Sequence, residues 1–586
     1  MERSIPIPDL STQSAKELLS GLSFEVFLAF LLIVCIITRT YSGFRSSFRS
    51  VQPGEARVAR TIPYWIPYIG HALSFGLWRR GLLENARDNT AEPVFGLYIC
   101  GRKHNMITSP SLAKGLLEQE SSISAESFAN RVMERVFGGR RRARKLNRAD
   151  FIQNCDSMEF QMKEPHASES SSATIREIKR NIPNLLSFCP SIVDQALWER
   201  MSKVALIDAS SRVCEVNLFA LVRNFVAINT MTAIMGSDFM EALPNTADDL
   251  WKFNNKFNPM AMGIQRWIPF PGLITAYRSR RRLLQGMEAF HSAFTVAEDG
   301  HDPGFDWREM DEVSGFIQTC CRQWKEAGLK PDAMAPESLA ILWAMNTKLI
   351  TIIFWNLMYI LSDGQYHSRI LKEIAPYSRA SRPDSGESGF RIREPPQLHL
   401  DVDRLLDSCP LLKASYFETL RLRSSPVTYR KITKDFKLTE SEEDAELANR
   451  KSETYQFKAG DFIAVPHTLY NTDERYFEDA NEFNPARFLK ETSLEDSELS
   501  EKPEPASEKV KLVAETPKLW FMGAENSASK DGKFAERIAL AFIASLLTMW
   551  DIKPANEMGW KIPMRTSGGL VYEPWGDVRA RMESKI

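Results

Sequence analysis

The chain has 586 residues, of which 44% are hydrophobic and 25% are charged, a composition typical of a globular protein with a large core. This composition excludes disordered, collagen-like and fibrous proteins. The 74 basic and 75 acidic side chains leave a net charge of -1, which provides no positive field for nucleic acid. Eight cysteines are too few for a disulfide scaffold and lack the paired spacing of a zinc site, so we expect a reduced body in the cytosol.

The first predicted element is a membrane anchor. A polar segment at 1–17 precedes an apolar run at 18–38, in which Glu25 is the single charge, and this length suits a helix that crosses a bilayer. Acidic residues precede the run, where a cleaved signal peptide would have basic ones. Arginines follow it, so the positive-inside rule places the body in the cytosol. We predict a single-pass anchor in the endoplasmic reticulum membrane, with a buried core helix as the alternative.

The anchor is followed by a predicted linker at 39–62 and a single large domain at 63–586. Residues 93–109 alternate around a glycine-containing turn and predict a β-hairpin, whereas helical periods dominate from 172 to 361. Polar stretches within the domain contain too few apolar residues to offset the entropy of ordering, and we predict mobile surface loops near 379–397, 439–455 and 491–510.

Residues 337–362 form the longest apolar run of the body. The run is long enough for a second membrane span. Lys348 near its middle and the amphipathic helices on both sides favour a buried core helix instead.

Charged residues near the end of the helical part form a recognisable pattern. Glu418 and Arg421 are three residues apart, so they share one helix face and can form an ion pair. Arg487, in the segment FNPARFL, can join them as a third member. The pair alone is unspecific. Its place in the chain is informative. It follows two segments, WIPYIGHALSFG at 65–76 and LWAMNTKLITIIFW at 342–355, and it precedes two others, YQFKAGDFIAVP at 455–466 and NPARF at 484–488.

In this order the motifs resemble the cytochrome P-450 superfamily, nearest its branch with cholesterol 7-alpha-hydroxylase, prostacyclin synthase and many fungal enzymes. The resemblance implies a mainly α fold with small β-sheets, a cytochrome P-450-like fold behind one N-terminal transmembrane helix. It also implies that Glu418, Arg421 and Arg487 form a structural charge network, and that Arg430 takes the place of an arginine that contacts a haem propionate.

The stretch that corresponds to the family's haem-binding loop contains no cysteine. It reads LWFMGAENSASKDGKFAERIALAFIASLL, and no cysteine follows Cys409 in the chain. The resemblance places Ser529, or Ala528 when the loop is anchored on Phe521, where the family has its thiolate ligand. From the resemblance we therefore expect no cofactor and no metal, with haem b as the alternative. A sequence error is the remaining explanation.

The long helix also departs from the family's pattern. Between Trp343 and Trp355 the resemblance predicts an Asn-Thr pair for proton delivery, where this chain has Lys348 followed by leucine. A desolvated lysine there could donate a hydrogen bond or a proton to a substrate carbonyl, and pairing with a carboxylate is the alternative. The predicted catalytic residues are Lys348, Thr347 and Asn346, and the predicted substrate pocket comprises Ala344, Met345 and Ile352.

Three functions follow from this reading. The favoured hypothesis is a redox-independent enzyme of fungal secondary metabolism, which orients a hydrophobic, terpenoid-like substrate for cyclisation or isomerisation. A norbornene-forming intramolecular Diels-Alder reaction is the concrete example. Its expected partners are the small-molecule substrate and the membrane, with no nucleic acid and no required reductase. The alternatives are a membrane-bound monooxygenase with an unusual haem site and a non-catalytic lipid-binding or regulatory pseudoenzyme.

Overall fold

The computed structural model describes residues 24–47, 55–90, 92–139, 165–208, 210, 212–308, 310–382, 396–424, 427–492, 511–514, 531–566 and 571–586. The chain divides into two compact units: unit 1 comprises Met1–Ser124 and Tyr429–Val465, and unit 2 comprises Ala125–Thr428 and Pro466–Ile586. The predicted fold class, mainly α with small sheets behind one N-terminal apolar helix, is confirmed. The single domain at 63–586 spans both units, and its boundaries stay a prediction.

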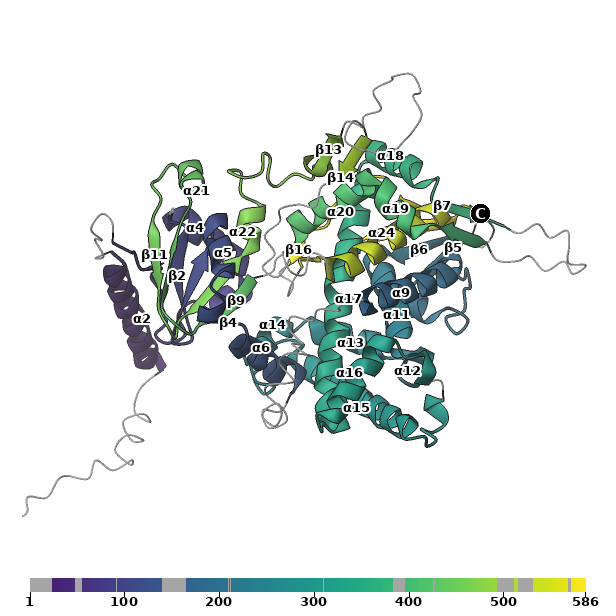
Figure 1. Cartoon of the computed structure of the whole chain (residues 1–586), viewed down its shortest axis with the longest axis horizontal. Coiled ribbons are helices and arrows are strands. Elements are labelled where there is room, and N and C mark those ends of the chain that lie inside the picture. Colours follow the sequence, from purple (N-terminus) through teal and green to yellow (C-terminus); the bar gives the residue numbers. More distant parts are fainter. Residues whose placement is uncertain are drawn as a thin grey trace, which may run out of the picture. The chain divides into compact units, whose positions relative to one another are not determined.

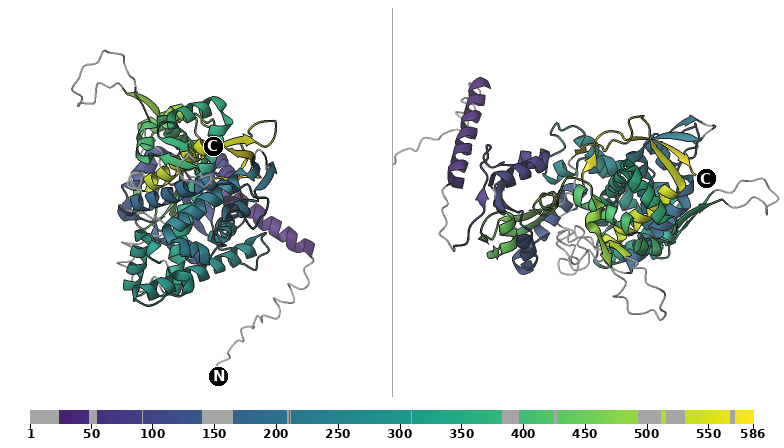
Figure 2. Two further views of the ribbon diagram at one scale, coloured as in Figure 1. Left: turned by 90° about the vertical axis from the view of Figure 1, so that its right-hand side faces the viewer. Right: turned by 90° about the horizontal axis from the view of Figure 1, so that it is seen from above.

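The N-terminal helix is α2, Phe24–Ser47, a straight helix in both views of Figure 2. Its segment Glu25–Ser46 is long and apolar enough to cross a membrane and is only 6% buried. The helix continues through the first part of the predicted linker at 39–62. The reason is that Ser42 exchanges hydrogen bonds of 3.2 and 3.1 Å with the backbone of Tyr64, which holds this last turn against the entry of the body. The predicted polar segment at 1–17 lies outside the described residues.

Unit 1 is built on a mixed sheet. Its strand order is β1-β2-β3-β12-β9-β4, with β1 at Arg60–Thr61, β2 at Val94–Ile99, β3 at Arg102–Ile107, β12 at Phe462–Pro466, β9 at Val427–Ile432 and β4 at Ile123–Ser124. Strands β2 and β3 pair antiparallel across a turn at Cys100 and Gly101, so the predicted hairpin is confirmed. Between β1 and β4 the helical segments are α3 at Ala72–Leu77, α4 at Arg79–Thr90, α5 at Pro110–Leu117 and η1 at Glu120–Ser122.

The predicted polar loop at 439–455 differs in the structure. Strands β10, Phe436–Thr439, and β11, Thr454–Phe457, flank a short helix α21, Glu442–Leu447. Asp444 of this helix accepts hydrogen bonds from the Ser109 hydroxyl at 2.9 Å and the Ser111 backbone at 2.7 Å. Buried polar bonds therefore order a segment whose apolar content alone is too low to do so.

Unit 2 is organised around α17, Pro331–Ser362, which runs through the unit in Figure 1. Its neighbours include α15 at Leu273–Glu298, α11 at Leu218–Met235, α20 at Pro410–Arg423 and α24 at Asp531–Met549. The most apolar window of α17 is 83% buried within the protein. The segment is therefore the core helix that the sequence predicts, and its neighbours cover the apolar surface that a membrane span would expose.

The other elements of unit 2 complete this helical body. Its helices are α6 at Glu126–Val132, η2 at Met133–Phe137, α9 at His166–Asn181, η3 at Ile182–Asn184, α10 at Leu197–Ser202, α12 at Ser237–Ala242, α13 at Thr246–Asn254, α14 at Phe257–Ala261, η4 at Phe305–Trp307, η5 at Met310–Glu312, α16 at Gly315–Glu326, α18 at Gly364–Ile374, α19 at Val402–Ser408, α22 at His467–Asn471 and η6 at Pro485–Phe488. Its sheet has the order β15-β18-β6-β5, with β15 at Trp550–Pro554, β18 at Arg579–Ser584, β6 at Val213–Asn217 and β5 at Ala205–Asp208.

Three further pairs of antiparallel strands form separate two-stranded sheets. Strands β7, Ser378–Ser381, and β8, Gln397–Leu400, pair at the two ends of the predicted loop at 379–397. Strands β13, Leu489–Thr492, and β14, Lys511–Ala514, do the same around 491–510, and the interiors of both loops lie outside the described residues. Strands β16, Arg565–Thr566, and β17, Glu573–Pro574, form the third pair.

Candidate functional site

One side of α17 is accessible although the helix lies in the core. From Met334 to Leu361, every residue is buried except Ala344, Thr347 and Lys348. Thr347 and Lys348 follow Ala344 by three and four residues, which is about one helical turn, so the three side chains lie on one side of the helix. We call them the open face. Partial exposure in this stretch of the helix is therefore confined to one side.

A row of four residues runs along this side of the helix. Trp343, Thr347, Thr351 and Trp355 are each four residues apart and therefore lie one above the other. The Thr347 hydroxyl donates to the Trp343 carbonyl at 2.9 Å, and the Thr351 hydroxyl donates to the Thr347 carbonyl at 2.9 Å. These bonds fix the threonine side chains and leave their oxygen lone pairs as acceptors.

The tryptophans tie both ends of this row to other elements. Trp343 Nε1 donates to Asn254 Oδ1 on α13 at 2.8 Å, and Trp355 Nε1 donates to the Tyr572 carbonyl at 2.7 Å. Asn254 Nδ2 in turn donates to Glu573 Oε1 at 2.8 Å. The C-terminal segment is therefore bonded to α17 directly at Trp355 and, through Asn254, indirectly at Trp343.

Two opposite charges meet at this segment. Glu573 is half-buried; burial raises the pKa of its carboxyl, and Arg223 and the bond from Asn254 oppose the shift. The Arg223 guanidinium lies 5.3 Å from the Phe219 ring centroid and 5.0 Å from that of Trp251, and burial lowers its pKa. We call Arg223, Asn254 and Glu573 the polar end of the site.

An aromatic wall borders the same end of the open face. The Trp343 ring stacks on Phe257 of α14 with centroids 4.5 Å apart and an interplanar angle of 10°. Phe137 of η2 meets the Trp343 ring edge-on at 5.7 Å. The accessible stripe of α17 is therefore bordered by flat apolar rings, which suit a hydrophobic ligand.

The structure brings some of the predicted site residues together. Lys348, Thr347 and Ala344 form the open face, and Lys348 is half-buried and has an interaction partner. The catalytic roles of Lys348 and Thr347 and the pocket role of Ala344 stay predictions.

The other predicted site residues of α17 do not lie on the open face. Asn346 is buried, donates Nδ2 to the Leu342 carbonyl at 2.8 Å, and has no partner for Oδ1 in the described part of the chain. Met345 and Ile352 belong to the hydrophobic core. The helical repeat of about 100° per residue turns Met345 and Asn346 away from Ala344. Ile352 lies four residues after Lys348 on the same side of the helix and is buried there.

The predicted charge network is assembled in unit 2. Glu418 and Arg421 are fully buried and form a bidentate pair with two contacts of 2.7 Å. Arg421 also donates to the carbonyls of Asn471, Ala480 and Glu482 at 2.5, 2.7 and 3.2 Å. Arg487 Nε lies 3.5 Å from Glu418 Oε1. The three side chains thus link α20 to the segment around η6.

The remaining predicted residues lie elsewhere. Arg430 is on β9 in unit 1, half-buried, and donates to the Tyr429 carbonyl at 3.1 Å; its contact with a propionate stays a prediction. Ser529 and Ala528 lie outside the described residues.

Sequence reasoning did not find the polar end. Arg223, Asn254 and Glu573 come from three distant segments and belong to no motif. The spacing of Trp343 and Trp355 is the one available signal, because twelve residues are three steps of four and predict a common row on the helix.

Comparisons with known proteins agree with the resemblance. The family model of cytochrome P450 matches residues 193–505. Cytochrome P450 monooxygenase poxD of Penicillium oxalicum is 20% identical over 86% of this chain and 89% of its own length. Cytochrome P450 monooxygenase nodJ of Hypoxylon pulicicidum is 20% identical over 94% and 96%, and cytochrome P450 7A1 of Oryctolagus cuniculus is 25% identical over 42% of each chain.

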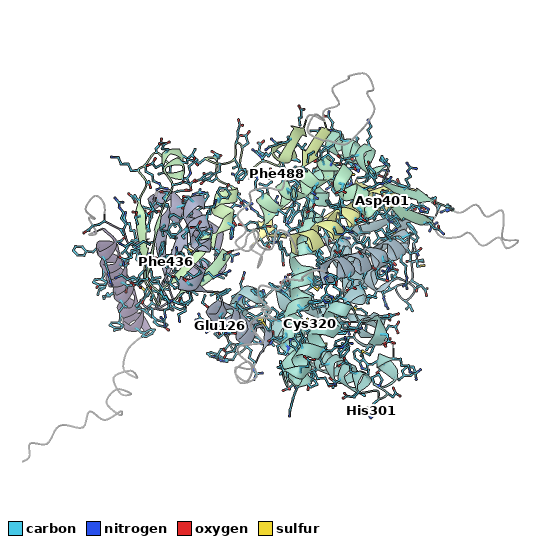
Figure 3. The ribbon with its side chains drawn as sticks, viewed as in Figure 1. Glu126, His301, Cys320, Asp401, Phe436 and Phe488 are labelled. Atoms are coloured by element: carbon cyan, nitrogen blue, oxygen red, sulfur yellow. The ribbon has the colours of Figure 1, made fainter. Side chains whose placement is uncertain are left out.

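These matches correct the expectation of no cofactor. The matched family and the relatives are cytochromes P450, which normally bind haem, so the expectation is wrong and haem is the implied cofactor. The residues of this chain do not provide the cysteine thiolate that binds the haem iron in this family. No cysteine follows Cys409, whose thiol is at the start of α20 with a pKa that burial raises to about 12. Cys320 and Cys321 are buried on α16, and burial raises the pKa of Cys321 to about 12 as well. Figure 3 labels Cys320.

The family assignment has two independent supports. The family model covers more than half of the chain, and the geometry of unit 2 places a long buried helix beside the Glu418–Arg421 pair that the resemblance names. The chain belongs to the cytochrome P450 family.

Proposed function

We propose that this chain is a membrane-anchored enzyme that promotes cyclisation or isomerisation of a hydrophobic, terpenoid-like substrate without net oxidation. The observation that carries the proposal is the absence of any cysteine from 410 to 586, where the family takes its thiolate ligand. The proposal concerns the reaction: turnover needs neither oxygen nor a reductase. We place it in fungal secondary metabolism because several relatives come from fungi.

The geometry of the open face supports such a reaction. A flexible polyene bound between flat rings and a helix loses conformational freedom before the reaction, which removes a large part of an intramolecular barrier. In a norbornene-forming Diels-Alder reaction, a diene and an alkene exchange two π bonds for two carbon–carbon σ bonds. No atom enters or leaves, so the product has the mass of the substrate.

Lys348 is the proposed donor on the open face. Its ammonium group has three N–H donors, and the residue lies on the open face. A donor that stabilises developing negative charge on a substrate oxygen lowers the barrier. Holding α17 in place through its present partner is the alternative role for this lysine.

We also propose that α2 anchors the chain in the endoplasmic reticulum membrane with the body in the cytosol. The low burial of its apolar segment supports the anchor, and the arginines after the segment support the orientation. The predicted partners are the hydrophobic substrate and the membrane, with no nucleic acid.

The test is turnover of the purified full chain in detergent with linear isoprenoid aldehydes and polyenes, with oxygen and reductant removed. The expected product is an isomer of the substrate. Loss of turnover without oxygen, or products that carry an added oxygen atom, would contradict the proposal.

Monooxygenation is the second candidate, because poxD and nodJ are named monooxygenases. It predicts an oxygenated product that depends on oxygen and reductase. The same assay, run with both supplied, separates the two functions by product mass.

A further inference from the structure

The polar end contains a guanidinium that makes no hydrogen bond to the part of the chain that the structure describes. Arg223 Nε is buried and has no partner, and neither a hydrogen bond nor an ion pair joins Arg223 to another residue that the structure describes. Glu573 is close enough to influence Arg223 electrostatically but is not paired with it. Asn254, by contrast, uses its oxygen for Trp343 and its nitrogen for Glu573.

An arginine with unused donors can bind a ligand that supplies an acceptor. A guanidinium has five N–H donors in a rigid plane, and a buried donor without an acceptor costs free energy. The rings of Phe219 and Trp251 hold this plane through cation–π contacts, so its direction is fixed before a ligand arrives. The missing component is an acceptor oxygen.

The charges select the kind of acceptor. A carboxylate would face the carboxyl group of Glu573 and be repelled when that group is ionised, whereas a neutral carbonyl oxygen would not. A hydrocarbon would leave Arg223 without an acceptor. The stacked rings of Trp343 and Phe257 favour a flat, conjugated chain next to this oxygen.

We propose that the polar end binds the carbonyl oxygen of a conjugated enone or enal through Arg223, while the hydrocarbon part lies along the open face. The inference rests on the proposed function in taking a hydrophobic small molecule as the substrate. Arg223 is the donor that binds this carbonyl, and Lys348, which already has a partner, stays the proposed donor to charge that develops in the transition state.

The hydrogen bond has a chemical consequence. Donation from Arg223 draws electron density from the carbonyl and from the alkene conjugated with it, and so makes that alkene a better partner for an electron-rich diene. No proton is transferred and no bond of the carbonyl is broken. Arg223 would then be a catalytic residue that touches the substrate, and Asn254 would be a positioning residue that holds Glu573.

The test is calorimetric binding to the full chain in detergent with three probes. These are β-ionone, an oxygen-free hydrocarbon with the same carbon skeleton, and β-ionylideneacetic acid. We expect β-ionone to bind most tightly, and Arg223→Gln to weaken it by about tenfold while weakening the hydrocarbon by less than about threefold. Glu573→Gln should strengthen binding of the acid. Arg281→Gln, which changes an exposed arginine of α15, is the matched control and should change nothing.

Three results would overturn the inference: no β-ionone binding, no preference for β-ionone over the hydrocarbon, or equal losses for both probes in Arg223→Gln. Melting curves of each variant separate a lost contact from a lost fold. Binding is measured without turnover, so the two proposals fail separately. If β-ionone binding depends on Arg223 but no isomer forms, the cyclase proposal fails alone. If isomers form and Arg223→Gln alters neither binding nor turnover, this inference fails alone.

Discussion

Unit 2 uses arginine and glutamate in two opposite ways. In the Glu418–Arg421 pair both side chains are fully buried and the guanidinium has acceptors on the carboxylate and on three backbone carbonyls. At the polar end, Arg223 and Glu573 are half-buried and form no ion pair with each other, and the guanidinium has no acceptor among the residues that the structure describes. A pair whose guanidinium N–H groups all have acceptors (a saturated pair) holds segments of the fold together. A pair whose guanidinium lacks acceptors (an unsaturated pair) can still donate hydrogen bonds to a ligand. The same two residue types therefore mark a structural site in one place and a binding site in the other.

The largest effect should come from breaking the saturated pair. Arg421→Met leaves Glu418 buried without its partner, and the loss of such a partner typically costs about 3–5 kcal/mol. We expect the free energy of unfolding to fall by this amount, or the full-length protein to fail to accumulate. Chemical unfolding followed by circular dichroism measures the change.

The chain offers a matched control for this prediction. Arg404 and Asp401 have the same three-residue spacing with 3.5 Å between their charged atoms, but they are exposed. Arg404→Gln should change the free energy of unfolding by less than about 1 kcal/mol. Equal losses in the two variants would show that burial does not distinguish the pairs.

The next effect concerns catalysis at the open face. Lys348→Met keeps the approximate length of the side chain and removes its charge. We expect turnover to fall by about tenfold or more, at the low end of the range for an acid or donor, with little change in melting temperature. Affinity for β-ionone should not change, because the carbonyl is assigned to Arg223. Unchanged turnover together with a lower melting temperature would make Lys348 a structural residue.

A smaller effect is expected when the unsaturated arginine is removed. Arg223→Gln deletes a half-buried charge that has no hydrogen-bond partner among the described residues, so little native stabilisation is lost. The free energy of unfolding should change by less than about 1 kcal/mol, in either direction. A loss as large as that of Arg421→Met would mean that Arg223 supports the fold, and the contrast between the two pairs would fail.

Residues close in sequence could be predicted, and residues joined only by the fold could not. The Glu418–Arg421 spacing on one helix turn, the apolar run of α17 and the alternation of β2 and β3 are local patterns, and each predicts its structure directly. The sequence also predicts Asn346, Met345 and Ile352 for the site, and in the structure all three side chains are buried. Arg223, Asn254 and Glu573 meet only because tertiary packing brings α11, α13 and β17 together. The predicted absence of a cofactor failed for another reason: it relied on one missing ligand, while the family relation depends on the whole chain.

The smallest expected effect is a pH dependence, and it tests whether Glu573 is held as an unpaired acid. Burial raises the pKa of its carboxyl above the ordinary value of 4.5, so the folded state binds the proton more tightly than the unfolded chain does. Its contribution to stability is therefore complete below the unfolded pKa and is lost as the pH rises through the folded pKa. Glu573→Gln cannot titrate. The free energy of unfolding of the natural protein, relative to that of Glu573→Gln, should fall from about pH 4 upward and become constant above the folded pKa.

Arg223 sharpens this last prediction, because its positive charge opposes the shift. In an Arg223→Gln background the pKa of Glu573 should rise further, and the pH-dependent part of the stability difference should extend to higher pH and become larger. Glu288→Gln, at an exposed position of α15, is the control and should show no comparable dependence. Unfolding curves of the four combinations of Arg223 and Glu573 variants measure the coupling between the two groups. The prediction fails if the difference in free energy of unfolding between the natural protein and Glu573→Gln does not depend on pH, or if Arg223→Gln leaves this dependence unchanged. Either result would show that Arg223 and Glu573 do not interact, and the two could not be treated as one binding site.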